Sequence, residues 1–117
     1  MSDDPYVFQA TVLIIIDGDT VDVDVDLGWN ISVTNQRIRL YAVDCPESRT
    51  RDLEEKKAGI AAKDRLSELM ERCDYKFVLV SHGVGKYGRC LGELFIENSQ
   101  ESVNQMLINE GHAQIYS

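Results

Sequence analysis

Residues 20–26 alternate strictly between apolar and acidic side chains, with valine at 21, 23 and 25 and aspartate at 22, 24 and 26. A period of two places alternate side chains on opposite faces of an extended chain, so this segment is predicted to be a half-buried β-strand. The Asp-Gly-Asp sequence at 17–19 indicates a turn, and residues 6–16 are rich in β-branched residues and predict a strand before it. Asp22, Asp24 and Asp26 are therefore expected to face solvent.

Two further segments carry helix signals. Each begins with a residue pair typical of a capping box, Asp52 with Glu55 and Ser102 with Gln105. After the first pair, apolar residues recur at spacings of three and four as far as Arg72. The second pair opens a short helix predicted over 103–109, and Gly111 stands at the position after it where a left-handed residue commonly ends a helix.

The remaining periodic segments read as strands. Residues 36–43, 76–81 and 90–96 predict three more strands, and 27–35 reads as a loop or ragged hairpin. The predicted order is β-β-β-α-β-β-α in one α+β, mainly β domain over 1–117. Five strands with a helix after the third are compatible with an OB-fold barrel, although periodicity alone leaves an open α+β sheet as an alternative.

The charge of this chain is unevenly distributed. The net charge is −8, but residues 37–65 carry eight basic and six acidic side chains, whereas residues 1–36 carry seven acids and no Lys or Arg. Only the middle of the chain is therefore positive enough to attract phosphates. The three cysteines lack metal-site spacing and suggest free thiols in a reducing interior. Without an apolar run of about 18 residues or a signal-like start, the chain is expected to be cytoplasmic, with no membrane contact.

Several polar residues are not explained by strand patterning. Arg39 lies inside the predicted strand 36–43, and the others stand at predicted strand ends and turns: Asp17, Asp19, Asp44, Glu47 and Arg89. Carboxylates at two strand ends can converge on a hard cation such as Ca²⁺, and two arginines can hold a phosphate with forked donors. A further glutamate can take a proton from water. Together these groups would suffice to hydrolyse a phosphodiester.

Four motifs in this order resemble the staphylococcal nuclease (thermonuclease) family, and the resemblance covers essentially the whole chain. They are "IDGDTV" (16–21), "RIRLYAVDCPE" (37–47), "GKYGR" (85–89) and "VNQMLINEGHAQIY" (103–116). The resemblance implies an OB-fold barrel and a calcium-dependent endonuclease. Its expected substrates are DNA and RNA, with single strands preferred, cleaved at the P–O5′ bond to leave 3′-phosphate ends.

The same resemblance assigns a metal site by position. Asp19 and Asp44 would be the carboxylate ligands of Ca²⁺, and the backbone carbonyl of Cys45 would be a third ligand. Asp17 would lie behind them and orient metal-bound water. Cys45 stands where the family usually has Thr or Ala, which is compatible with a role for its carbonyl alone.

The resemblance also assigns the groups that act on the phosphate. Glu47 matches the glutamate usually taken as the general base for the attacking water, and Arg39 and Arg89 match the arginines that hold the scissile phosphate. Lys86 and Tyr87 match positions that contact a neighbouring phosphate or nucleotide.

Four interpretations stay open or are excluded at this stage. A binding module on the same fold is the alternative to an enzyme, and the chain is a monomer or a homodimer. Trp29, the one tryptophan, either stacks on a base or covers an apolar edge. An EF-hand loop starting at Asp22 is excluded, because its sixth and twelfth positions would be Leu27 and Val33 instead of Gly and Glu.

Overall fold

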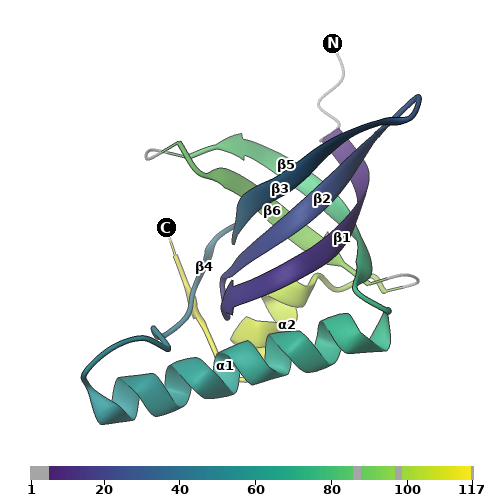
Figure 1. The fold of residues 1–117 in the computed structure, drawn as a ribbon. Helices are drawn as coiled ribbons and strands as arrows, with labels where there is room; N and C mark the ends of the chain where they lie inside the picture. Colours follow the sequence, from purple (N-terminus) through teal and green to yellow (C-terminus); the bar gives the residue numbers. More distant parts are fainter. Residues whose placement is uncertain (1–5, 86–87, 97–98, 117) are drawn as a thin grey trace.

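The computed structural model describes residues 6–85, 88–96 and 99–116. Within these residues five strands close a barrel in the order β1-β2-β3-β6-β5, with α1 lying across one end (Figure 1). The barrel strands are β1 Tyr6–Asp17, β2 Thr20–Gly28, β3 Ile31–Leu40, β5 Lys76–Val84 and β6 Cys90–Phe95. The other elements are β4 Val43–Asp44, α1 Leu53–Arg72, α2 Val103–Asn109 and β7 Gln114–Ile115, of which β4 and β7 form a small separate sheet. The predicted mainly β barrel of OB type is confirmed, and the open sheet is excluded.

Of the two alternatives for 27–35, a loop or a ragged hairpin, the structure has the hairpin, and the segment is mostly strand. β2 runs to Gly28 and β3 begins at Ile31, so only Trp29 and Asn30 connect them. Both have positive φ, 55° and 62°, as a two-residue turn of type I′ requires. The hairpin projects beyond the barrel (Figure 1). Trp29 is 96% exposed, so the interpretation that it covers an apolar edge is wrong.

The three aspartates of β2 do not share one environment. Asp22 is only 7% exposed, because the Arg37 side chain, directly opposite on β3, donates to it from Nε at 2.8 Å and Nη2 at 3.1 Å. This hydrogen bond lowers the pKa of the Asp22 carboxyl. Asp24 is half-buried and accepts the Asn35 backbone N–H at 2.9 Å, and Asp26 is exposed. The prediction of a solvent-facing row is therefore wrong for Asp22 and right for Asp26.

The predicted helix limits are confirmed. Asp52 accepts backbone N–H bonds at 3.0 and 3.2 Å in the first turn of α1, and Ser102 accepts one at 3.1 Å in α2. The helices end at Arg72 and Asn109. Gly111 has a φ of +82°, as expected for the left-handed residue that follows a helix.

The core joins the barrel interior to the buried faces of both helices. α1 contributes Leu66, Leu69 and Met70, and α2 contributes Val103 and Leu107, all at most 1% exposed. Burial of a large aliphatic side chain contributes about 1.5–3 kcal/mol, so this cluster fixes the helices against the barrel. No helix in the described parts of the chain is both long and apolar enough to cross a membrane.

Candidate functional site

The β1–β2 turn, the end of β3 and the segment after β4 meet at the α1 end of the barrel. Asp19, in the β1–β2 turn, connects them. Its carbonyl accepts the Leu40 N–H at 2.8 Å, and its carboxylate accepts the Cys45 N–H at 3.0 Å and the Thr20 hydroxyl at 3.0 Å. Asp19 is 5% exposed. A buried carboxylate needs such donors to offset its lost hydration, and here the donors also fix its position.

Arg39 lies between two of the predicted metal ligands. Its guanidinium is 3.6 Å from a carboxylate oxygen of Asp19 and 3.6 Å from one of Asp44. It also donates to the Val43 carbonyl at 3.3 Å, and it lies 5.5 Å from the centre of the Tyr116 ring. Arg39, Asp19 and Asp44 are thus brought together as the sequence predicts. The flat guanidinium retains donors for a further oxygen ligand.

Asp17 holds the loop that carries Glu47. Its carboxylate accepts the backbone N–H of Ser48 at 3.3 Å and also the Ser48 hydroxyl. Ser48 is 8% exposed, so this link is shielded from water. Asp17 therefore lies close behind the site and fixes the backbone next to Glu47, while its predicted effect on a metal-bound water stays a prediction.

Two glycines let α1 approach this loop at backbone distance. A Cβ at Gly59, in α1, would lie 2.4 Å from the carbonyl oxygen of Glu47. A Cβ at Gly18, in the β1–β2 turn, would lie 2.8 Å from the Cβ of Ala62. Heavy atoms do not approach so closely, so any side chain at either position would push α1 away. The close contact with α1 thereby fixes the position of the loop that carries Glu47.

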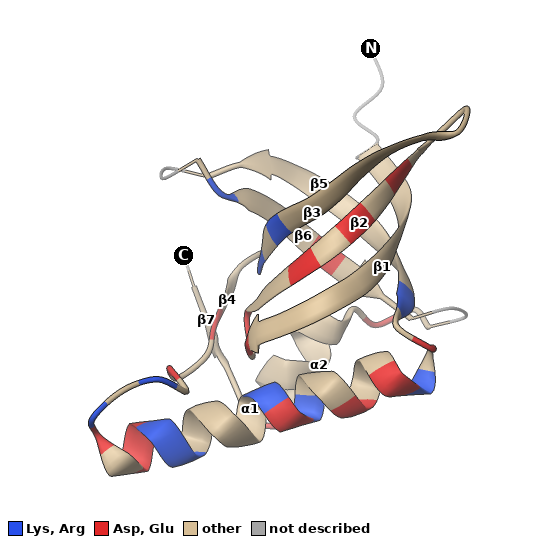
Figure 2. Cartoon of the chain, in the orientation of Figure 1, with Lys and Arg blue, Asp and Glu red and all other residues tan. Residues whose placement is uncertain are grey.

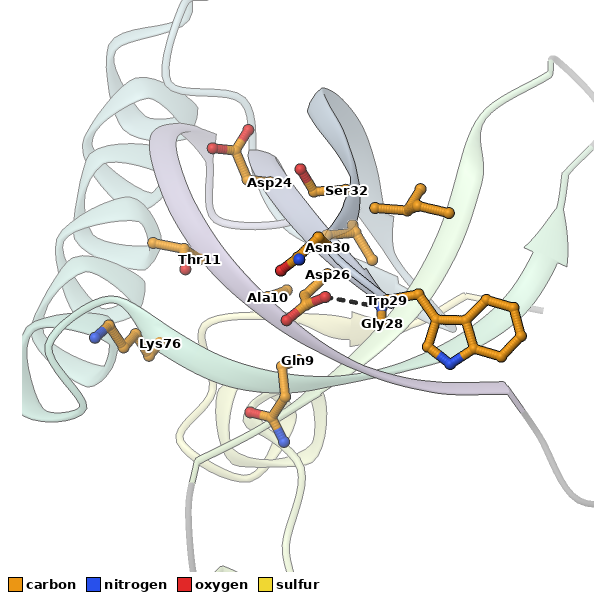
Figure 3. A pocket seen from close by; sticks show the side chains of 12 residues that line it. Gln9, Ala10, Thr11, Asp24, Asp26, Gly28, Trp29, Asn30, Ser32 and Lys76 are labelled. Carbon is orange, nitrogen blue, oxygen red and sulfur yellow. Dashed lines mark hydrogen bonds between the residues drawn. The ribbon is translucent and has the colours of Figure 1, made fainter.

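Asp44, Cys45 and Glu47 line an open depression of about 490 Å³, whose other wall includes His112. The three acidic side chains that line it, Asp44, Glu47 and Glu55, are exposed. A larger depression, of about 600 Å³, lies at the projecting hairpin and contains none of the predicted site residues. Figure 3 shows that the indole of Trp29 points away from the other side chains that line it. Of these two depressions, only the smaller is lined by predicted site residues.

Arg89 is exposed and stands one residue before β6. β6 runs parallel to β3, with Cys90 opposite Ile38 and Leu91 opposite Arg39, so the backbones at the two predicted phosphate-binding arginines are neighbours. Figure 2 shows basic positions on β3 and just before β6 on this side of the barrel. Lys86 and Tyr87, the predicted contacts to a neighbouring nucleotide, lie outside the described residues.

The donor chemistry of the site suits a hard cation. Asp19 and Asp44 offer carboxylate oxygens, and the Cys45 carbonyl would add a third oxygen of the kind that Ca²⁺ takes. Burial and the nearby Asp19 charge raise the pKa of the Cys45 thiol to about 12. Across the described residues, no three acidic, His or Cys side chains are already grouped as a complete metal site. Such an ion would need water or substrate oxygens as further ligands.

Sequence reasoning missed three residues of this site. Ser48 hydrogen-bonds Asp17, Gly59 lets the Glu47 loop pack closely against α1, and the Tyr116 ring covers Arg39. Gly59 carries a usable signal, because a glycine inside a helical run costs stability and often has a packing reason. Ser48 and Tyr116 carry none, since their roles depend on contacts between distant segments.

Sequence comparisons with known proteins found a family and two relatives. The family described as staphylococcal nuclease homologue matches residues 37–117. The micrococcal nuclease of Shigella flexneri is 29% identical over 116 residues, which cover 93% of this chain and 59% of that protein. An uncharacterized protein of Bacillus anthracis is 32% identical over 111 residues, covering 92% of this chain and 47% of that protein. The chain therefore spans about half to three fifths of the length of these relatives.

Proposed function

Because this chain belongs to the staphylococcal nuclease homologue family, we propose that it is a calcium-dependent nuclease that cleaves DNA or RNA. The observation that most supports this proposal is the position of Arg39, within 3.6 Å of both Asp19 and Asp44. Two carboxylates and an arginine at one point provide groups for a cation and for the phosphate beside it.

The arginines act on the phosphate. Arg39 is 19% exposed in its side chain, so a phosphate oxygen bound there is partly removed from water. Such an environment strengthens a charge-assisted hydrogen bond. Arg89 reaches the same phosphate from the β6 side. Charge that develops on the phosphate oxygens in the transition state is thereby stabilised by two fixed cations.

Glu47 acts on the water. Its carboxylate takes a proton as the water oxygen attacks phosphorus, the P–O5′ bond breaks, and the 5′-oxygen takes a proton from solvent. The product ends are a 3′-phosphate and a 5′-hydroxyl. Asp17 and Gly59 fix the backbone around Glu47 and so keep its carboxylate in a constant position relative to the phosphate.

Asp19, Asp44 and the Cys45 carbonyl would hold Ca²⁺, which when bound supplies positive charge to the phosphate oxygens. Single strands are the expected substrate, because their bases and backbone are accessible to a shallow site.

The test is cleavage of denatured DNA with Ca²⁺, with Mg²⁺ and with EDTA. We expect cleavage with Ca²⁺, less with the smaller Mg²⁺, which demands a stricter octahedral arrangement, and none with EDTA. Full cleavage in EDTA would overturn the calcium requirement. Tight binding of DNA without cleavage under any condition would show a binding module instead.

Variants locate the activity. Arg39→Ala should lower kcat by roughly 10²–10³-fold, as loss of one charge-stabilising donor does elsewhere. Arg37→Ala is the matched control, because Arg37 lies on the same strand and also pairs with an aspartate, Asp22. It should change kcat by less than about threefold under conditions where the variant is folded. If kcat falls equally in the two variants, the fall would reflect the loss of one positive charge and not a specific role of Arg39.

A further inference from the structure

Two aromatic rings lie stacked on the outer surface of the barrel beside the candidate site. The rings of Tyr41 and His82 are 3.9 Å apart between centroids, with an interplanar angle of 1°. His82 Nε2 is 2.6 Å from a carboxylate oxygen of Glu93. Tyr41 directly follows β3, His82 lies in β5 and Glu93 lies in β6. None of them is used in the proposed hydrolysis.

The backbone that carries Tyr41 is held by a buried polar side chain. Asn104 is 4% exposed, and its amide group donates to the carbonyls of Tyr41 at 3.0 Å and Gly92 at 3.1 Å. The Tyr41 N–H in turn donates to the Gly92 carbonyl at 2.8 Å. The backbone that carries the tyrosine is therefore fixed to β6, and the Glu93 contact fixes the imidazole. Such a surface is preorganised, because little side-chain freedom remains to be lost on binding.

The stack also lies close enough to Arg39 for one nucleotide to contact both. Tyr41 follows Arg39 by two residues, and two residues of extended chain advance about 6.6 Å. On β6, Glu93 follows Leu91 by two residues, and Leu91 is the register partner of Arg39. The stack therefore continues the surface on which Arg39 lies, and Tyr41 remains 40% exposed.

We infer that the stacked rings of Tyr41 and His82 form a platform for a nucleobase next to the phosphate held at Arg39. This inference rests on the proposed function, because it names a second contact of the same substrate. A flat aromatic surface accepts any base, since every base has a π-face. The carboxylate of Glu93 contacts His82 and so holds its ring in place. The platform would place the sugar-phosphate chain across the site.

The test is binding of short single-stranded DNA to the full chain in EDTA, where the proposed hydrolysis does not proceed. One oligonucleotide carries 2-aminopurine, whose fluorescence falls when it stacks, and a second has an abasic residue at the same position. We expect the wild type to quench 2-aminopurine and to bind the abasic strand about 5- to 150-fold more weakly, the range that one base–aromatic stack supplies. In Tyr41→Leu the quenching should disappear, and the abasic strand should bind as well as the normal one.

Tyr75→Leu is the matched control, because Tyr75 is also 40% exposed and also has a partly solvated ring, but lies at the α1–β5 connection. It should quench and bind as the wild type does. Tyr41→Phe keeps the flat ring and should retain quenching. An equal abasic penalty in wild type and Tyr41→Leu would overturn the platform, and so would an absence of base-dependent binding in EDTA. Lack of cleavage with Ca²⁺ overturns the proposed function separately, because the quenching signal needs no catalysis.

Discussion

Substitution of Gly59 by alanine tests how the helix positions the site. In a helix that contacts nothing, this change stabilises by about 0.8–1 kcal/mol, because glycine is the weaker helix former. Here we expect the opposite sign. An added Cβ would lie 2.4 Å from both the carbonyl carbon and the carbonyl oxygen of Glu47, and 2.6 Å from the nitrogen of Ser48. These are backbone atoms, which cannot rotate away as a side chain does.

The size of the effect follows from this overlap. Heavy atoms essentially never approach a Cβ below 3.0 Å, so helix and loop must separate by at least about 0.6 Å, the difference from 2.4 Å. Overpacking costs typically 1–3 kcal/mol, and the contact with fixed backbone places Gly59→Ala near the upper end. After subtraction of the gain in helix propensity, the free energy of unfolding should fall by about 2 kcal/mol. The midpoint of thermal unfolding should fall by about 8 °C.

Two assays read this change. Urea unfolding of wild type and Gly59→Ala gives the difference in the free energy of unfolding. Cleavage of denatured DNA, measured where both proteins are folded, should fall by roughly tenfold or more. The reason is that displacement of the Glu47 loop by a fraction of an ångström misaligns the base, and a shift of about 1 Å can cost 10²-fold.

The control is Ala61→Gly, at an exposed position of the same helix. It should destabilise by about 1 kcal/mol from propensity alone and leave cleavage unchanged. If Gly59→Ala instead stabilises the protein by about 1 kcal/mol, the helix does not contact the loop as described and the reasoning is refuted.

Three other predictions concern stability. The Arg37 hydrogen bond lowers the pKa of Asp22, so the pair stabilises the fold above pH 3.8, the ordinary pKa of this carboxyl. This stabilisation is lost as the pH falls through the lowered native pKa. Between pH 6 and pH 3, the free energy of unfolding measured with urea should therefore fall less for Asp22→Asn than for wild type. Asn104→Ala should lower the free energy of unfolding by about 2 kcal/mol, because the buried N–H of Leu94 and the Tyr41 carbonyl lose their partner, and a change below about 0.5 kcal/mol would contradict that role. Trp29→Asn should raise the free energy of unfolding by up to about 1 kcal/mol, and with it the thermal midpoint, because asparagine tolerates the positive φ better and the exposed indole has little burial to lose. A lower midpoint would show that the indole packs against the protein.

The order and type of the main elements could be predicted because each carries a local signal. The caps at Asp52 and Ser102, the glycine at 111 and the alternation in β2 depend on neighbours in sequence, and all lie where expected. The hairpin at 27–35 stayed one of two alternatives, because Trp29-Asn30 is not the Asn-Gly or Asp-Gly pair that usually indicates such a turn. Its positive φ values are imposed by the strands on either side.

The candidate site was predictable in its charged residues and unpredictable in its supports. Asp19, Arg39 and Asp44 do meet, and their order in the chain indicated this. The burial of Asp22 was not predictable from alternation, because it depends on which residue of β3 stands opposite, and that is Arg37. The short β4–β7 sheet, which brings Tyr116 to Arg39, joins segments about 70 residues apart. Such pairings have no local signature.

The parallel contact of β3 with β6 is the short seam of the barrel. It has three register pairs, from Ile38↔Cys90 to Leu40↔Gly92, and is continued by the bond from the Tyr41 amide to the Gly92 carbonyl. Local opening should therefore begin here, and amide hydrogen exchange would detect it at Tyr41. Arg39 lies on one side of the seam and Arg89 adjoins the other, so a phosphate that binds both arginines binds only the closed barrel. A bound nucleic-acid strand should then slow amide exchange at Tyr41 in proportion to its occupancy. The substrate would thereby stabilise the contact between β3 and β6 that forms part of its own binding site.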